Sequence, residues 1–131
     1  MKFLIAIEPG TDTTAFGVVV PDLPGCFSAG DTLEEAFDNA REAIDAHLEA
    51  IAEDGGAIPV PVPMQLHQAN PDFKGWTWGV VDVDATRYEG KAEKINITVP
   101  GRLLAKIDAY AQAHGTSRSG FLADAARAAM R

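Results

Sequence analysis

The sequence has little cysteine and few basic residues, and it lacks any long hydrophobic run. Cys26 is the single cysteine among 131 residues, which excludes an internal disulfide and fits a reducing compartment. No apolar run approaches the roughly 18 residues that a membrane helix needs. The apolar residues 3–7 meet Glu8 and Pro9 at once, too soon for the core of a signal peptide. We therefore expect a cytoplasmic protein without a membrane span, and an apolar share of 47% argues against a disordered one.

The shortage of basic residues is confined to the first part of the chain. Residues 1–90 hold 16 acidic and 4 basic residues, a net charge of −12, whereas residues 91–131 hold 7 basic and 3 acidic residues, a net charge of +4. An acidic body repels nucleic acid and attracts basic partners, while a basic tail can neutralise phosphates. This division of charge indicates two partners of opposite charge. The alternative is that both sets of charged residues only solvate the surface.

The first part of the chain reads as an α+β unit of the form βββα-β. Period-two runs and β-branched or aromatic residues predict strands, and they are found at residues 2–8, 15–20, 26–29 and 76–84. Residues 58–63 alternate with proline and cannot form a ladder strand, so they are predicted as an extended connector. One helical turn is predicted at residues 64–69, and the polar residues 85–93 are predicted as a linker.

A long amphipathic helix is the clearest element, from residue 31 to residue 54. Two capping boxes compete for its start, Asp31 with Glu34 or Thr32 with Glu35. Gly55 and its glycine neighbour end it. Apolar residues recur every three or four positions, which predicts a stripe buried on the sheet: Leu33, Ala36, Phe37, Ala40, Ile44, Leu48 and Ile51. The opposite face is acidic.

The last forty residues predict one strand and two helices. Residues 94–99 alternate polar and apolar, and Pro100 is suited to the first position of a helix. His114 and Gly115 end that helix, and a second helix follows the turn at residues 116–119. So small a unit rarely has a sufficient core of its own. Pairing the lone strand with the same strand of a second chain supplies a core and covers its exposed edges. Such a two-stranded ribbon fits the major groove of DNA and turns alternate side chains outward: Lys94, Asn96 and Thr98.

This region resembles the ribbon-helix-helix family. The resemblance rests on residues 95–100, the pairs at 103–104 and 107–108, and residues 115–119. It implies that Lys94, Asn96 and Thr98 read base edges, and that the start of the second helix binds a phosphate, here at Ser117, Arg118 and Ser119. The sequence departs from the family at Gly120, where a glutamate is frequent, so Ser117 has no capping-box partner. Gly120 also lowers helix propensity by roughly 1 kcal/mol relative to alanine.

The whole chain is similar to HicB-type antitoxins. The N-terminal likeness rests on residues 21–26, 30–36 and 39–43. It implies a partial RNase H-like domain at residues 1–88, a linker at 89–93 and a ribbon-helix-helix domain at 94–131. The first domain would bind and block HicA, a small basic toxin that cleaves mRNA, and the second would bind the double-stranded operator DNA of its own operon. A homodimer through the C-terminal strand is implied, with a tetramer open.

Candidate toxin contacts follow from the acidic helix and from the proline-rich loop. We predict Asp22, Leu23, Pro24 and Gly25 in the loop, and Glu42, Asp45 and Glu49 on the helix. Two other functions stay open at this point. One is a repressor with the same DNA-binding tail whose first domain senses a small ligand or metal.

The other function is an RNase H-like nuclease. It would need converging carboxylates on two Mg²⁺ ions, for which Glu8, Asp82 and Asp84 are the candidates. The interior of the first strand carries no acid, which disfavours catalysis. The three histidines show no metal-ligand spacing, and Cys26 is better explained as a structural thiol than as a nucleophile. We therefore expect no enzyme, no metal and no cofactor.

Overall fold

The computed structural model describes residues 1–131, which form two compact units, Met1–Lys91 and Ala92–Arg131. The division falls inside the segment predicted as a linker. No helix in either unit has the length and apolar character needed to cross a membrane.

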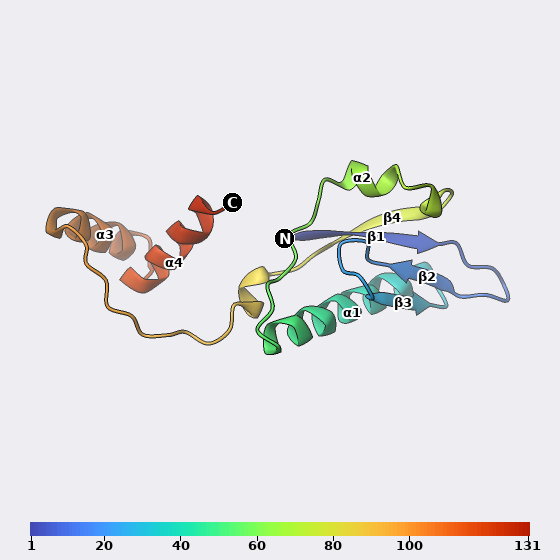
Figure 1. Ribbon diagram of the computed structural model, residues 1–131, viewed down its shortest axis with the longest axis horizontal. Helices are drawn as coiled ribbons and strands as arrows, with labels where there is room; N and C mark the ends of the chain where they lie inside the picture. The colour runs from blue at the N-terminus through green and yellow to red at the C-terminus, as the bar shows by residue number, and fades with distance from the viewer. The chain divides into compact units, whose positions relative to one another are not determined.

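The N-terminal unit is built on a four-stranded antiparallel sheet of order β3-β2-β1-β4 (Figure 1). Its strands are β1 (Lys2–Glu8), β2 (Phe16–Val19), β3 (Phe27–Gly30) and β4 (Thr77–Asp82). All four predicted strands are present, with small shifts at their ends. The central strand β1 is buried on both faces from Phe3 to Ile7, which explains why its apolar run is continuous rather than alternating.

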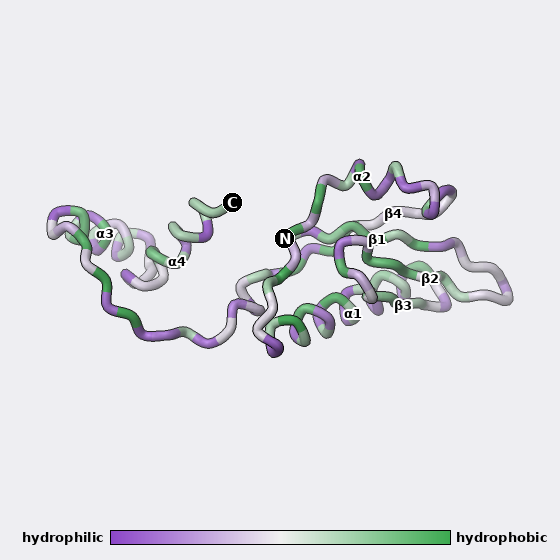
Figure 2. The backbone as a smooth tube through the Cα atoms, in the orientation of Figure 1, coloured by the Kyte–Doolittle hydropathy of each residue, from purple (hydrophilic) through white to green (hydrophobic).

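The helix α1 (Leu33–Glu53) covers one face of this sheet. The structure decides between the two capping boxes: the Thr32 hydroxyl accepts from the Glu35 N–H at 3.1 Å, and the Glu35 carboxylate accepts from the Asp31 N–H at 2.9 Å. At the other end Gly55 has φ +74°, and the Gly56 N–H donates to the Ile51 carbonyl at 2.9 Å. Both ends therefore follow from local sequence. Figure 2 shows how hydrophilic and hydrophobic residues alternate along α1.

Two glycines let α1 lie close to the sheet. A Cβ on Gly79 of β4 would lie 2.4 Å from the Phe37 ring, and a Cβ on Gly30 of β3 would lie 2.4 Å from the Ala36 nitrogen. Gly79 pairs with Ile5 in the register of β1 and β4, so Ile5 faces α1 as well. The core between sheet and helix includes buried Phe3, Ile5, Ile7, Val18, Val81, Ala36, Ala40, Ile44 and Leu48.

The other face of the sheet carries only short segments. Residues 58–63 form no strand, as predicted, and lead to α2 (Met64–Gln68) and a 3₁₀ turn, η1 (Pro71–Phe73).

After β4 a second 3₁₀ turn, η2 (Ala85–Tyr88), returns to the core, where Tyr88 is buried. The prediction that residues 85–93 are wholly linker is therefore wrong for the part up to Tyr88, because one aromatic in a polar segment is enough to anchor it.

The C-terminal unit contains α3 (Gly101–Ala113) and α4 (Arg118–Ala129), which contact each other. Pro100 is the N-cap of α3 rather than its first residue, and Gly115 has φ +68° after the α3 C-cap. Residues 94–99 are assigned neither helix nor strand. A strand is defined by hydrogen bonds to a neighbouring strand, and a single copy of this unit has no other strand to offer.

Candidate functional site

The sheet face opposite α1, which we call the open sheet face, is apolar; it is buried at Leu4 and Ala6 in its centre and exposed at Phe27 in β3 and at Val80 in β4. Cross-strand partners share a face, and the register places Phe27, Val19, Ala6 and Trp78 in one row across all four strands. The Phe73 ring of η1 meets the Trp78 ring edge-on, with centroids 5.5 Å apart, and so covers the β4 end of the row. The β3 end is left open, and the Phe27 side chain there is 65% exposed.

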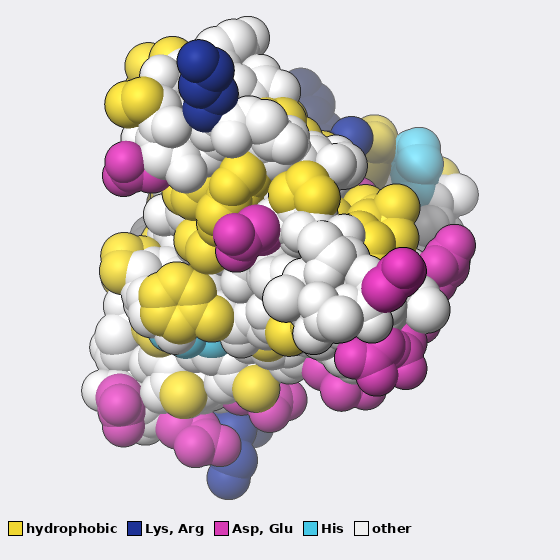
Figure 3. All heavy atoms as spheres, turned by 90° about the vertical axis from the view of Figure 1, so that its right-hand side faces the viewer, with side chains coloured by type: hydrophobic (Ala, Val, Ile, Leu, Met, Phe, Trp, Pro, Cys, Tyr) yellow, Lys and Arg dark blue, Asp and Glu magenta, His cyan; other side chains and the backbone are white.

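A hollow of about 270 Å³ lies at this open end of the row. It is lined by the loop before β3, by strand residues and by the α2–η1 segment, and the lining includes Val19, Pro24, Phe27, His67 and Phe73. Figure 3 shows the side of the molecule that lies on the right in Figure 1, where hydrophobic side chains gather near the centre and Asp and Glu side chains lie around them.

Asp22 fixes the loop that forms one wall of the hollow. Its carboxylate is 5% exposed, and one oxygen accepts from the Val62 N–H at 3.1 Å and contacts His67 Nε2 at 2.8 Å. Leu23 is buried in the core. Asp22 and Leu23 were predicted as toxin contacts, and their burial removes both side chains from that role. Pro24 and Gly25 are exposed at the loop tip, where Gly25 has φ +83°.

The acidic outer face of α1 is also changed by the tertiary structure. Asp45 accepts a short hydrogen bond from the Tyr88 hydroxyl and lies 3.7 Å from the Arg87 guanidinium. Asp45 thus has partners within the chain, and its side chain is still 30% exposed. Burial, followed by the hydrogen bond and charge of Asp45, raises the pKa of Tyr88 to about 12. Glu42 and Glu49 remain exposed.

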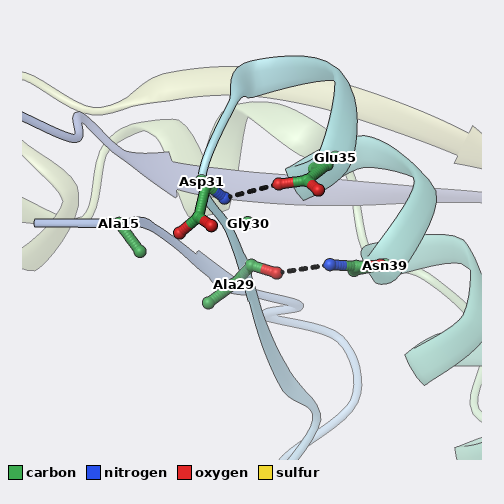
Figure 4. A pocket seen from close by; sticks show the side chains of 6 residues that line it. All are labelled: Ala15, Ala29, Gly30, Asp31, Glu35 and Asn39. Atoms are coloured by element: carbon green, nitrogen blue, oxygen red, sulfur yellow. Dashed lines mark hydrogen bonds between the residues drawn. The ribbon is translucent and has the colours of Figure 1, made fainter.

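A second hollow lies where β3 enters α1 (Figure 4). It is also about 270 Å³ and is lined by Ala15, Ala29, Gly30, Asp31, Glu35 and Asn39. Two of its polar side chains point at backbone groups rather than into the hollow: Asn39 Nδ2 donates to the Ala29 carbonyl at 2.7 Å, and Glu35 accepts from the Asp31 N–H. These contacts assign the hollow a structural role at the helix start.

The three carboxylates considered for a nuclease do not meet. β1 and β4 are antiparallel, with Lys2 opposite Asp82 and Ile7 opposite Thr77. Glu8 and Asp82 therefore lie at opposite ends of the sheet, on the order of 20 Å apart at about 3.3 Å per residue. Asp84 caps η2 by accepting from the Thr86 N–H and hydroxyl, and these bonds lower its pKa. No group of three metal-ligating side chains occurs anywhere in the chain.

Cys26 is buried beside the loop, and burial raises the pKa of its thiol. A thiol held in its protonated form is a poor nucleophile, which agrees with the structural interpretation of this residue.

In the C-terminal unit, the residues predicted to read bases are all exposed. Lys94, Asn96 and Thr98 lie in the segment before α3. The apolar residues that alternate with them are exposed too, Ile95 by 73% and Ile97 by 58%. Only Ile107 and Ala111 are buried in the whole unit. The C-terminal unit therefore offers no apolar surface that covers Ile95 and Ile97.

The start of α4 is capped by its own sequence, and Arg118 there has a partner that the sequence did not predict. Ser117 is the N-cap, and its hydroxyl accepts from the Gly120 N–H at 3.0 Å. The Arg118 side chain, however, donates to both carboxylate oxygens of Asp108 on α3, at 2.8 and 2.7 Å. This pairing lowers the pKa of Asp108 and raises that of Arg118. The predicted role of Arg118 as a direct phosphate ligand thus competes with its role as a tether between the helices.

Comparison with known proteins matches this arrangement to a family. A family model described as the HicB-like antitoxin of bacterial toxin–antitoxin systems matches residues 3–126. The chain belongs to this family. It is 48% identical over 128 residues to an uncharacterized 14.9 kDa protein of Haemophilus phage HP1, and the match spans 96% of this chain and 95% of that protein.

Solved structures of HicB antitoxins share the fold. The antitoxin HicB of Burkholderia pseudomallei is 39% identical, with a TM-score of 0.68 over 100% of this chain and 99% of that one. A chain of the HicA3 and HicB3 toxin–antitoxin complex is 32% identical, with a TM-score of 0.54 over 64% of this chain and 99% of its own length. The α+β fold with a four-stranded antiparallel sheet is thus that of HicB antitoxins.

Proposed function

We propose that this HicB-like antitoxin neutralises a HicA-type, mRNA-cleaving toxin by direct binding and represses its own operon by binding operator DNA. The partial RNase H-like N-terminal unit would bind the toxin, and a ribbon-helix-helix dimer formed by residues 94–131 would bind the DNA. Both targets would be met in the cytoplasm. The acidic N-terminal unit supports toxin binding, and the exposed segment 94–99 supports DNA binding.

The C-terminal unit supports dimerisation because it is too thinly cored to stand alone. It buries only Ile107 and Ala111, while Ile95, Ile97, Leu103 and Tyr110 are exposed. Ordering forty residues costs far more free energy than the burial of two side chains returns. Pairing residues 94–99 with a second copy would cover these apolar groups. Association of those dimers into tetramers through other surfaces is compatible with this arrangement.

The same pairing would place Lys94, Asn96 and Thr98 on the outer side of the ribbon, once in each chain. Lysine donates, asparagine both donates and accepts, and threonine offers a hydroxyl and a methyl, which are the groups that read major-groove base edges. The first N–H groups of α4, next to Ser117 and Ser119, would hold a backbone phosphate at the positive end of the helix dipole.

The acidic N-terminal unit supports binding of a basic protein. Residues 1–90 carry a net charge of −12, which disfavours contact with mRNA or DNA and favours a cationic partner. The solved HicA3 and HicB3 complex contains a chain similar to 64% of this one. Glu42 and Glu49 on α1, and Pro24 and Gly25 in the loop, are the predicted contacts that are exposed. Covering the catalytic surface of the toxin would be sufficient for inhibition.

Two measurements test the proposal. The tagged chain, expressed from its own operon, should copurify with a small basic HicA-type protein and should shift a DNA fragment that carries its promoter. In the second, Asn96→Ala should lose roughly 1–3 kcal/mol of binding free energy on the operator and relax specificity at one base pair, with little change on random DNA. Equal losses on operator and random DNA would contradict base reading by Asn96.

A further inference from the structure

The net charge of the N-terminal unit does not say which of its surfaces would bind the toxin. Two surfaces compete: the outer face of α1, with exposed Glu42 and Glu49, and the open sheet face on the opposite side of the core. Only the second combines exposed large apolar side chains with a hollow. Exposed apolar patches with polar rims mark interaction sites on monomers, whereas scattered surface carboxylates do not.

We propose that the open sheet face is the docking surface for the basic toxin, with Phe27 as its anchor. This inference rests on the proposed antitoxin function and names the site within it. Phe27 ends the row that runs through Val19 and Ala6, and it lines the hollow together with His67 and Phe73. Val80 lies on the same face, because it pairs with Leu4 on the side away from α1, and it is exposed as well.

Charge selects a basic protein as the occupant. Two copies of an acidic body of net charge −12 repel each other, and the phosphates of nucleic acid are repelled in the same way. Exposed Glu8 lies at one end of the face, whereas Asp82 at the other end lies opposite Lys2 and 3.3 Å from the N-terminal ammonium of Met1. An exposed apolar surface on a unit of net charge −12 is complementary to a basic protein that offers apolar side chains surrounded by lysine and arginine.

The walls of the hollow are already ordered, which lowers the cost of binding. The Asp22 carboxylate ties the loop to Val62 and to His67 of α2. Backbone bonds close the same loop, from the Cys26 N–H to the Leu23 carbonyl at 2.9 Å and from the Leu23 N–H to the Val20 carbonyl at 3.0 Å. A rigid pocket rim around an aromatic anchor is the arrangement in which single residues carry much of the binding energy. Asp22 and His67 are therefore positioning residues of the site rather than contacts.

The test measures toxin affinity by calorimetry, using the full-length chain and the HicA-type protein that copurifies with it. Phe27→Ala should weaken binding by about tenfold or more, as expected for an aromatic anchor. Val80→Thr, on the same face, should weaken it by a smaller factor. The comparison variant is Glu42→Lys with Glu49→Lys on the rival α1 surface, where both residues are exposed contacts predicted from the sequence, and its loss of affinity should be smaller than that of Phe27→Ala. Phe27 is mostly exposed, so unchanged thermal unfolding shows that its removal leaves the fold intact.

The outcomes separate this inference from the proposed function. A loss confined to the α1 variant, with Phe27→Ala and Val80→Thr binding normally, overturns the docking face while leaving the antitoxin function in place. Failure of the unchanged chain to copurify with any small basic protein from its operon contradicts the proposed function itself.

Discussion

Single residues show how the tertiary structure reassigns side chains that look alike in sequence. Asp45 and Glu49 are neighbours on the acidic side of α1, yet only Asp45 is taken up by Tyr88 and Arg87. Asp22 and Pro24 are neighbours in one loop, yet only Asp22 turns inward to His67. In each pair, one residue has met a partner that is distant in sequence and the other has not.

Tyr88 gives a pH prediction for the N-terminal unit. Its pKa is about 12 in the folded unit, against an ordinary value of 10.0. Because the folded pKa is raised, its contribution to stability is complete below about pH 10 and is lost as the pH rises toward 12. Urea unfolding followed by the fluorescence of Trp76 and Trp78, both in this unit, should show that fall. In Tyr88→Phe the additional fall above pH 10 should be absent; an identical fall in both proteins would assign it to other groups.

Arg118 gives a second prediction, because its two candidate roles predict opposite effects of Asp108→Asn on DNA binding. If it tethers α3 to α4 through Asp108, then Arg118→Ala and Asp108→Asn should weaken DNA binding alike. If it is mainly a phosphate ligand, Asp108→Asn should release it and strengthen binding at low salt, while Arg118→Ala weakens binding and flattens the salt dependence. Titration of operator DNA at several salt concentrations distinguishes these results, and we expect the tether.

The same pair has a defined pH window. The pKa of Asp108 is lowered by Arg118, so the stability it contributes is present above the ordinary carboxyl value and is lost as the pH falls through the folded value. If Arg118 is the tether, Arg118→Ala should lower helix stability at neutral pH and have no such effect in acid. Circular dichroism measures this difference.

At the scale of elements, the junction between β3 and α1 depends on the absence of a side chain. A Cβ on Gly30 would lie 2.4 Å from the Ala36 nitrogen, a backbone atom that cannot move without disturbing the first turn of α1. Gly30→Ala should therefore lower the free energy of unfolding of the N-terminal unit by about 1–3 kcal/mol.

Gly17 provides the matched control for that substitution. It lies in the neighbouring strand β2, where an added Cβ would come no closer than 3.5 Å to Glu8. Gly17→Ala should change the free energy of unfolding by less than about 0.5 kcal/mol. Urea denaturation measures both variants, and equal effects would show that the close approach of Gly30 to α1 is not what matters.

At the scale of the whole molecule, the two units have different relations to solvent. The N-terminal unit has its own core between sheet and helix, whereas the C-terminal unit exposes the residues that would form one. Folding of the second unit is thus expected to depend on protein concentration, while folding of the first is not.

Ile97 tests this dependence directly. Ile97→Lys removes an apolar group that has no partner within its own unit, so it should abolish the dimer and operator binding while toxin binding continues. Thr98→Ala, the next residue on the opposite side of the strand, should keep the dimer and weaken only DNA binding. Sedimentation velocity at micromolar concentration reports the dimer. A dimer that survives Ile97→Lys would show that residues 94–99 do not form its interface.

The sequence by itself determined the elements, because helix caps, glycine ends and hydrophobic periods are local properties of the chain. Thr32 with Glu35, Gly55, and the apolar stripe of α1 act within a few residues of themselves. The charge division between the units was equally visible in the sequence. Only the tertiary structure decided that the Asp22 side chain and Tyr88 are buried, that Asp45 pairs with Tyr88, that the antiparallel register separates Glu8 from Asp82, and that Phe27 is exposed at the end of its row. Each of these depends on which distant segment comes to lie alongside, and no local preference of the chain encodes that neighbour.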